Sequence, residues 1–147
     1  MPKLSFVSIK PTTKHTASVI FLHGLGDSGH GWRDDGQLLG PALPHIKWIF
    51  PHSQERSITV NGGARMPGWY DIISLERIVG QEDEVGMLES KSLIQELIDA
   101  ELDLGIPNTR IIVGGFSQGA AMSLLTGLGS KIKLNGLAVL SGYLPNL

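Results

Sequence analysis

The sequence predicts a layered α/β fold, a mostly parallel sheet with flanking helices, from two observations. Short apolar runs rich in β-branched residues alternate with longer segments of helical periodicity. In the clearest case, an apolar run at residues 110–114 is followed closely by an alanine-, leucine- and methionine-rich run at residues 120–125. Parallel strands need crossover helices, so this alternation indicates right-handed connections within one sheet. A length of 147 residues favours a single domain, residues 1–147.

Three further segments have the character of buried strands. Residues 17–22 and 137–140 are short apolar runs, and residues 46–50 form another that stops at Pro51. Runs that are apolar throughout, without strict alternation, are typical of a sheet covered on both faces.

The clearest helix is expected at residues 84–104. Apolar side chains recur there at spacings of three and four, which leaves the charged residues mostly on the opposite face. Gly105 can take the left-handed position after the helix, and Pro107 follows just beyond. Residues 32–44 contain enough glycine and proline to permit only a short helix, and residues 51–83 are expected to be irregular and to line the site.

Composition excludes several classes of function. Twelve Lys and Arg against 14 Asp and Glu give a formal net charge of −2, with no basic cluster, so nucleic acid is not an expected partner. No apolar run reaches the length of a membrane span, and residues 1–10 lack the apolar core of a signal peptide. Cysteine is absent, which excludes disulfides, thiolate metal sites and a cysteine nucleophile. We therefore expect a cytoplasmic or nuclear protein.

The candidate catalytic motif is the G-x-S-x-G match at residues 115–119, with Ser117 at its centre. The predicted strand before it and the predicted helix after it are what a nucleophile elbow requires. Glycines on both sides of Ser117 would let strand and helix approach closely, while the strained turn lifts the hydroxyl clear of the sheet. The motif alone fits an ordinary glycine-rich turn with an exposed serine equally well.

A second glycine-rich loop follows the predicted strand at residues 17–22. Gly24, Gly26 and Gly29 satisfy G-x-G-x-x-G, the dinucleotide fingerprint. That hypothesis is disfavoured, because the helix that follows is short and the first carboxylate after the next strand, Glu55, comes late for a ribose ligand. The loop fits an oxyanion hole better, in which the backbone N–H groups of Leu25 and Gln118 converge on a developing negative charge.

The other candidate side chains leave alternatives open. His23 is expected to brace the glycine-rich loop by hydrogen bonding rather than to act as a base. Trp69 and Tyr70 fit core packing and the wall of an apolar substrate channel equally well. Residues 118–147 contain no Asp, Glu or His, although in the usual order of such hydrolases the triad acid and base follow the serine.

Four stretches together resemble the acyl-protein thioesterases, also called lysophospholipase-like carboxylesterases. They are residues 21–32, 66–73, 105–121 and 138–145, in the family's order and over nearly the whole chain. The resemblance implies an α/β-hydrolase fold and removal of palmitoyl and related acyl groups from protein cysteines, with weaker action on lysophospholipids and simple esters. It implies Ser117 as nucleophile and the N–H groups of Leu25 and Gln118 as oxyanion hole, without a metal or cofactor.

The sequence also departs from that family. Family members continue past the position of Leu147 with strands and helices that hold the triad Asp and His, so the chain resembles a partial domain that is incomplete at its C-terminal end. The resemblance implies S-acylated proteins or lipid esters as substrates, and the exposed last strand suggests a homo-oligomer. The alternatives are a catalytically inert fragment that only binds acyl chains or partners, and, less favoured, a dinucleotide-binding domain.

Overall fold

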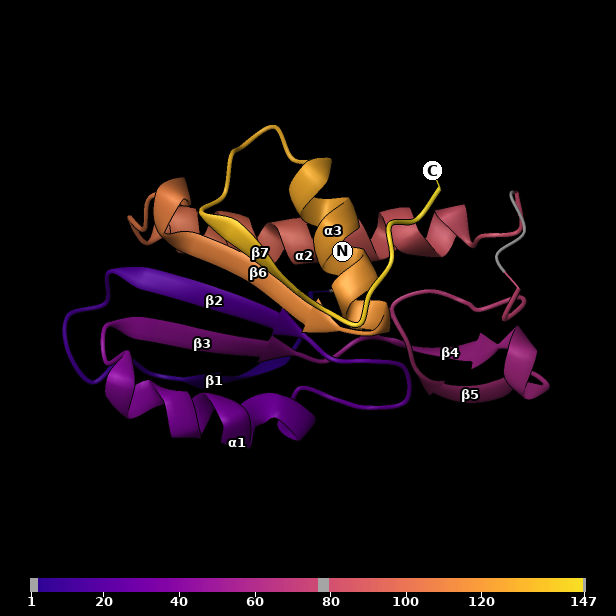
Figure 1. The fold of residues 1–147 in the computed structure, drawn as a ribbon, viewed down its shortest axis with the longest axis horizontal. Helices are drawn as coiled ribbons and strands as arrows, with labels where there is room; N and C mark the ends of the chain where they lie inside the picture. Colours follow the sequence, from indigo (N-terminus) through magenta and orange to yellow (C-terminus); the bar gives the residue numbers. More distant parts are fainter. Residues whose placement is uncertain (1–2, 77–79, 147) are drawn as a thin grey trace.

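The computed structural model describes residues 3–76 and 80–146, and its centre is a five-stranded sheet (Figure 1). Its strand order is β1-β3-β2-β6-β7, with β1 antiparallel to β3 and all other neighbours parallel. The strands are β1 (Phe6–Ile9), β2 (Ala17–Leu22), β3 (Ile46–Pro51), β6 (Ile111–Phe116) and β7 (Gly136–Leu140). The prediction of a mostly parallel α/β sheet is confirmed.

Helices cover both faces of this sheet, as Figure 1 shows. Helix α1 (His30–Leu39) contacts β1 and β3, while α2 (Glu84–Asp103) and α3 (Gln118–Leu128) pack together on the opposite face. Alternate residues of β2 point to opposite faces of the sheet: Val19 packs in the aromatic cluster on the α1 side, and Ile20 packs in the larger core under α2 and α3. The central strands are therefore buried on both faces, which explains their continuous apolar sequences.

The predicted boundaries agree with the structure to within a few residues. Helix α2 ends where expected, and Gly105 has a φ of +92°, the left-handed conformation that stops it. Helix α1 begins at His30, two residues before the predicted segment, and spans ten residues before a short 3₁₀ turn. Strand β3 includes Pro51, which pairs with Phe6 of the edge strand β1.

Three strands were not predicted, β1 and the two strands of a hairpin. Strand β1 is four residues long and contains no fully buried residue, so its sequence lacks a strong apolar signal. The segment 51–83, expected to be irregular, holds an antiparallel hairpin of β4 (Glu55–Ile58) and β5 (Ala64–Pro67). Its turn passes through Gly62 and Gly63, both with positive φ. Residues 77–79 of the same segment lie outside the described residues.

Strand β7 ends the sheet on the side of α3, and no described strand pairs with its outer edge. Its last two side chains, Val139 and Leu140, are 36% and 46% exposed. Among residues 3–76 and 80–146, no helix has both the length and the apolar character needed to cross a membrane.

Candidate active site

Ser117 occupies a strained turn between β6 and α3, and its side chain is exposed. Its φ of 54° and ψ of −114° are rare for a residue with a side chain, and such outliers persist where the surrounding structure enforces them. A Cβ on Gly115 would lie 2.4 Å from the backbone of Gly119, and one on Gly119 would lie 2.1 Å from the Leu22 oxygen. Both glycines are therefore required by the close approach of strand and helix, as the elbow geometry demands.

Backbone hydrogen bonds hold the turn in place. The Ser117 N–H donates to the oxygen of Leu140 at the end of β7, over 2.9 Å. The backbone carbonyl oxygen of Ser117 accepts the Ala121 N–H over 3.1 Å, which starts the hydrogen bonding of α3. Because the first N–H groups of a helix have no intrahelical partner, the start of α3 presents donors and a positive dipole end beside Ser117. The N–H of Gln118, the first helical residue, is one of them.

The glycine-rich loop after β2 lies against this turn. Leu22 and Gly115 are partners in the β2–β6 register, so the loop begins beside the elbow. A Cβ on Gly24 would come within 3.6 Å of the Ser117 Cβ. Leu25 is half-buried, and the next residue, Gly26, has a φ of +81° and donates its N–H to the Pro67 oxygen over 2.8 Å. The structure thus brings the two predicted oxyanion segments, at residues 24–26 and 117–118, together.

His23 is fully buried and both of its ring nitrogens are engaged. Nδ1 donates to the Gly24 oxygen over 2.7 Å, and Nε2 accepts the Ser53 N–H over 3.0 Å, which fixes the neutral tautomer. Burial lowers the pKa of His23, and this effect exceeds the opposing influence of the Gly24 carbonyl and of Asp27. His23 therefore braces the loop, as expected, and does not face Ser117 as a free base.

His52 is a second brace, a role that the sequence did not indicate. Its Nδ1 accepts the Gly29 N–H over 3.1 Å, and its ring lies 5.0 Å from that of His30. Burial, and next the neighbouring His30, lower the pKa of His52. A Cβ on Gly29 would meet the Phe50 oxygen at 2.1 Å, so this glycine is required for packing against β3 rather than for a pyrophosphate. Only the position of His52 just after a predicted strand could have drawn attention to it.

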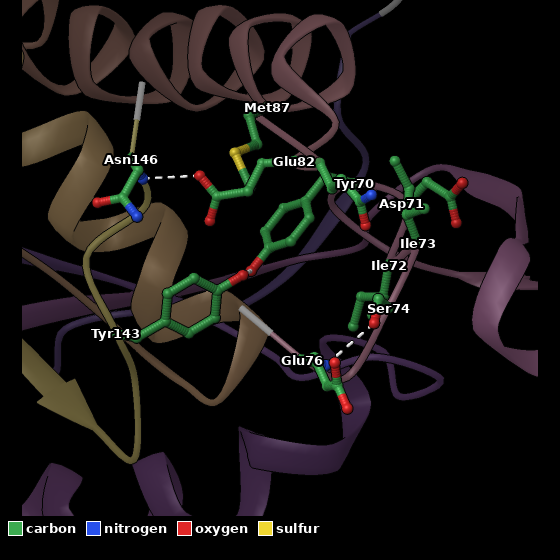
Figure 2. Close-up of a pocket in the computed structure, with 11 residues that line it drawn as sticks. Tyr70, Asp71, Ile72, Ile73, Ser74, Glu76, Glu82, Met87, Tyr143 and Asn146 are labelled. Carbon is green, nitrogen blue, oxygen red and sulfur yellow. Dashed lines mark hydrogen bonds between the residues drawn. The ribbon is translucent and has the colours of Figure 1, made fainter. Parts of the chain in front are cut away.

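Trp69 and Tyr70 lie in the core, each 1% exposed. The Trp69 Nε1 donates to the His23 oxygen over 2.9 Å. Figure 2 shows the Tyr70 hydroxyl meeting that of Tyr143, with an oxygen–oxygen distance of 2.7 Å. Tyr70 also lines a cavity of about 50 Å³ beside Met87 of α2, well below the usual size of a ligand pocket. A substrate channel along these aromatics stays a prediction.

The side chain of Gln118 has a role that the motif did not indicate. It is 3% exposed, and its Oε1 accepts the Trp69 N–H over 2.8 Å while its Nε2 donates to the Tyr70 oxygen over 2.8 Å. The second variable position of G-x-S-x-G gives no sequence signal for such a contact.

The site therefore combines a strained serine, a helix N-terminus and a braced loop. No cluster of three potential metal-ligating side chains occurs in the part of the chain that the structure describes. This arrangement suits attack by the Ser117 hydroxyl on an acyl carbon, with the nearby N–H groups stabilising the oxyanion that results.

Comparison with known proteins also points to hydrolases that act on acyl groups. The sequence model described as Phospholipase/Carboxylesterase matches residues 4–147. Acyl-protein thioesterase 1 of Schizosaccharomyces pombe is 52% identical over 97% of this chain and 63% of its own length, and that of Cryptococcus neoformans is 49% identical over 97% and 60%. The crystal structure of Zea mays acyl-protein thioesterase 2 is 33% identical and superimposes with a TM-score of 0.76 over 96% of this chain and 63% of the other.

Proposed function

The chain belongs to the phospholipase/carboxylesterase family, and we propose that it supplies the nucleophile and oxyanion hole of an acyl-protein thioesterase. The observation that carries this proposal is the strained, exposed Ser117 at the start of α3, facing the loop at residues 24–26. The names of the curated relatives support a thioester substrate. The chain spans 60% and 63% of the length of the two curated relatives named above, so the activity of a whole protein is part of the proposal.

The chemistry follows from the positions of these groups. Ser117 Oγ attacks the thioester carbonyl carbon, the C–S bond breaks, and the cysteine thiol leaves with a proton. The backbone N–H groups of Leu25 and Gln118 stabilise the tetrahedral oxyanion. Water then cleaves the acyl–serine ester, which releases the fatty acid and restores the hydroxyl.

This reaction needs a base to accept the proton of the Ser117 hydroxyl. Residues 118–147 contain no Asp, Glu or His, and His23 is fully engaged with Gly24 and Ser53. We infer that the base and its orienting acid come from polypeptide that the longer relatives have beyond the matched part. Without them, an oxyanion hole alone leaves a residual acceleration of about 10³–10⁴-fold over water.

The finer parts of the proposal concern substrate and setting. We infer palmitoyl and related acyl groups on protein cysteines, and also lysophospholipids and simple esters, as substrates of a cytoplasmic or nuclear protein. We also propose that residues 1–147 fold as one partial domain and that copies associate through the outer edge of β7, with which no described strand pairs. The exposed apolar side chains of that strand, Val139 and Leu140, support such an association.

A second candidate function is binding without turnover. It is favoured by the engaged ring nitrogens of His23 and by the lack of any acidic or imidazole side chain after Ser117. Such a chain would hold a palmitoylated peptide stoichiometrically and release no thiol. The dinucleotide hypothesis is not retained, because Gly29 serves loop packing and the family matched is one of hydrolases.

The deciding experiment is intact-mass spectrometry after exposure to a fluorophosphonate probe, which reacts with activated serines. The wild-type chain, Ser117→Ala and Ser141→Ala are compared, since Ser141 is another exposed serine with positive φ at the end of a neighbouring strand. One adduct in the wild type and in Ser141→Ala, absent from Ser117→Ala, is expected if the chain itself is active. A folded wild-type chain that takes no adduct but binds palmitoylated peptide would show that residues 1–147 by themselves bind without turnover.

A further inference from the structure

The side chain of Gln118 is a buried polar group that the proposed reaction does not use. It bonds at both ends to the backbone of a distant segment, accepting from the N–H of Trp69 and donating to the oxygen of Tyr70. One acceptor and one donor at adjacent residues reproduce what a neighbouring strand would offer. Gln118 thereby ties the start of α3 to residues 69–70, 48 and 49 positions earlier in the chain.

Residues 67–69, which run into the bonded pair 69–70, hold the glycine-rich loop through three contacts. The Pro67 oxygen accepts the Gly26 N–H over 2.8 Å, and the Trp69 indole donates to the His23 oxygen over 2.9 Å. Between them, a Cβ on Gly68 would lie only 3.0 Å from Leu25 Cδ1, so the segment packs directly on the Leu25 side chain. Residues 67–69 therefore hold the loop at His23, at the Leu25 side chain and at Gly26.

Residues 67–70 are themselves anchored to other elements. Ser90 of α2 donates its hydroxyl to the Trp69 oxygen, and the Arg56 Nε of β4 donates to the Gly68 oxygen over 2.7 Å. The segment thus acts as a frame held by α2 and β4. Moving residues 67–70 would break the buried Ser90–Trp69 hydrogen bond and the part-buried Arg56–Gly68 hydrogen bond, which is costly.

We propose that the Gln118 side chain is a positioning residue that sets the separation between the two oxyanion donors, its own backbone N–H and that of Leu25. The inference rests on the oxyanion hole of the proposed function. Its physical basis is a continuous set of contacts. Gln118 bonds to residues 69–70, the segment that contains them bonds to Gly26 and His23, and Gly24 of the same loop lies beside Ser117. Oxyanion stabilisation depends on such prior organisation of donors.

The test is amide hydrogen exchange of the folded chain, followed residue by residue by NMR. Gln118→Leu removes both hydrogen bonds, and Gln118→Met does the same while it keeps the unbranched length of the side chain. The matched control is Ser123→Ala, which removes a buried hydroxyl of the same helix that donates to the Ala120 oxygen. None of these measurements depends on activity, so their result is independent of the fluorophosphonate experiment, which tests the proposed function.

The expected result is exchange about tenfold or more faster in Gln118→Leu at the Trp69 N–H and also at the Gly26 N–H and the Trp69 indole. Gln118→Met should show a similar change at the same groups, and Ser123→Ala none. Faster exchange confined to the Trp69 N–H would overturn the proposal, because the loop would then be independent of Gln118. A uniform rise over β2, β3 and β6 in both Gln118 variants would overturn it too, since the side chain would act only on global stability.

Discussion

At the scale of single residues, two histidines hold the loop beside Ser117 in place by accepting backbone hydrogen bonds. His23 and His52 each accept a backbone N–H, from Ser53 and Gly29 respectively, and each can do so only with an unprotonated ring nitrogen. The sequence predicted a bracing role for His23, because a histidine that opens a glycine-rich loop has backbone groups within reach. It could not predict His52 or the Gln118 side chain, since their partners depend on how distant segments pack.

Acid should weaken the fold through His23. Its pKa in the folded chain is lowered, by burial first, so the unfolded chain binds more protons below the ordinary value of 6.5. The stabilisation is present in full above pH 6.5 and is lost as the pH falls toward the folded pKa, at up to about 1.4 kcal/mol per pH unit for one proton. Asp27 and His52 face His23 and act in opposite directions on its pKa.

Urea unfolding at pH 7.5, 6.5 and 5.5 measures this effect. We expect the wild-type free energy of unfolding to fall over that range and the slope to be reduced in His23→Gln, which has no titratable ring. His45→Gln is the control, because His45 is only half-buried. Equal slopes in the wild type and His23→Gln would contradict the assignment.

At the scale of elements, the elbow explains which parts of the fold could be predicted. Strands β2 and β6 are apolar on both faces, and the glycines at positions 115 and 119 indicate that α3 packs closely on them. The sequence therefore predicted the strand, turn and helix around Ser117 correctly. The β4–β5 hairpin was missed because its strands are four residues long and only Ile58 is fully buried. Short, exposed strands depend on pairing partners that local sequence does not reveal.

Gly119→Ala should separate α3 from the end of β2. Its Cβ would lie 2.1 Å from the Leu22 oxygen and 2.5 Å from the His23 oxygen, and neither backbone atom can move without disturbing the sheet. We expect a loss of about 1–3 kcal/mol in the free energy of unfolding, measured by urea denaturation.

Gly40→Ala is the matched control for that substitution. Gly40 has helical dihedral angles, with φ −50° and ψ −49°, and an added Cβ meets nothing within 4 Å. The gain that alanine brings through the unfolded state is opposed by Pro41, because a Cβ on the residue before proline disfavours the helical region, so the net change in the free energy of unfolding should be smaller than for Gly119→Ala. If Gly119→Ala proved as mild as Gly40→Ala, the close contact between α3 and β2 would be wrong.

At the scale of the whole molecule, the sheet is covered unevenly. Helix α1 contacts β1 and β3, while the α1 side of β6 and β7 leaves Phe116 40% and Leu140 46% exposed. Phe116 and Leu140 are partners in the β6–β7 register, so they form one apolar surface beside the outer edge of β7. Next to it, Leu140 lines an aromatic cavity of about 260 Å³ together with Phe21, Trp32 and Phe50. Such a surface favours association.

Leu140→Lys should therefore weaken self-association of the chain. A lysine on an edge strand opposes pairing with a second edge, and removal of one buried leucine from an interface costs roughly 1.5–3 kcal/mol, which is about tenfold or more in the dissociation constant. Light scattering after size exclusion, over a range of protein concentrations, gives the mass of the species. Leu104→Lys is the control, because Leu104 is 64% exposed just after α2, outside the sheet. A wild-type chain that stays monomeric at every concentration would contradict association through β7, and an equal shift in both variants would place the interface elsewhere.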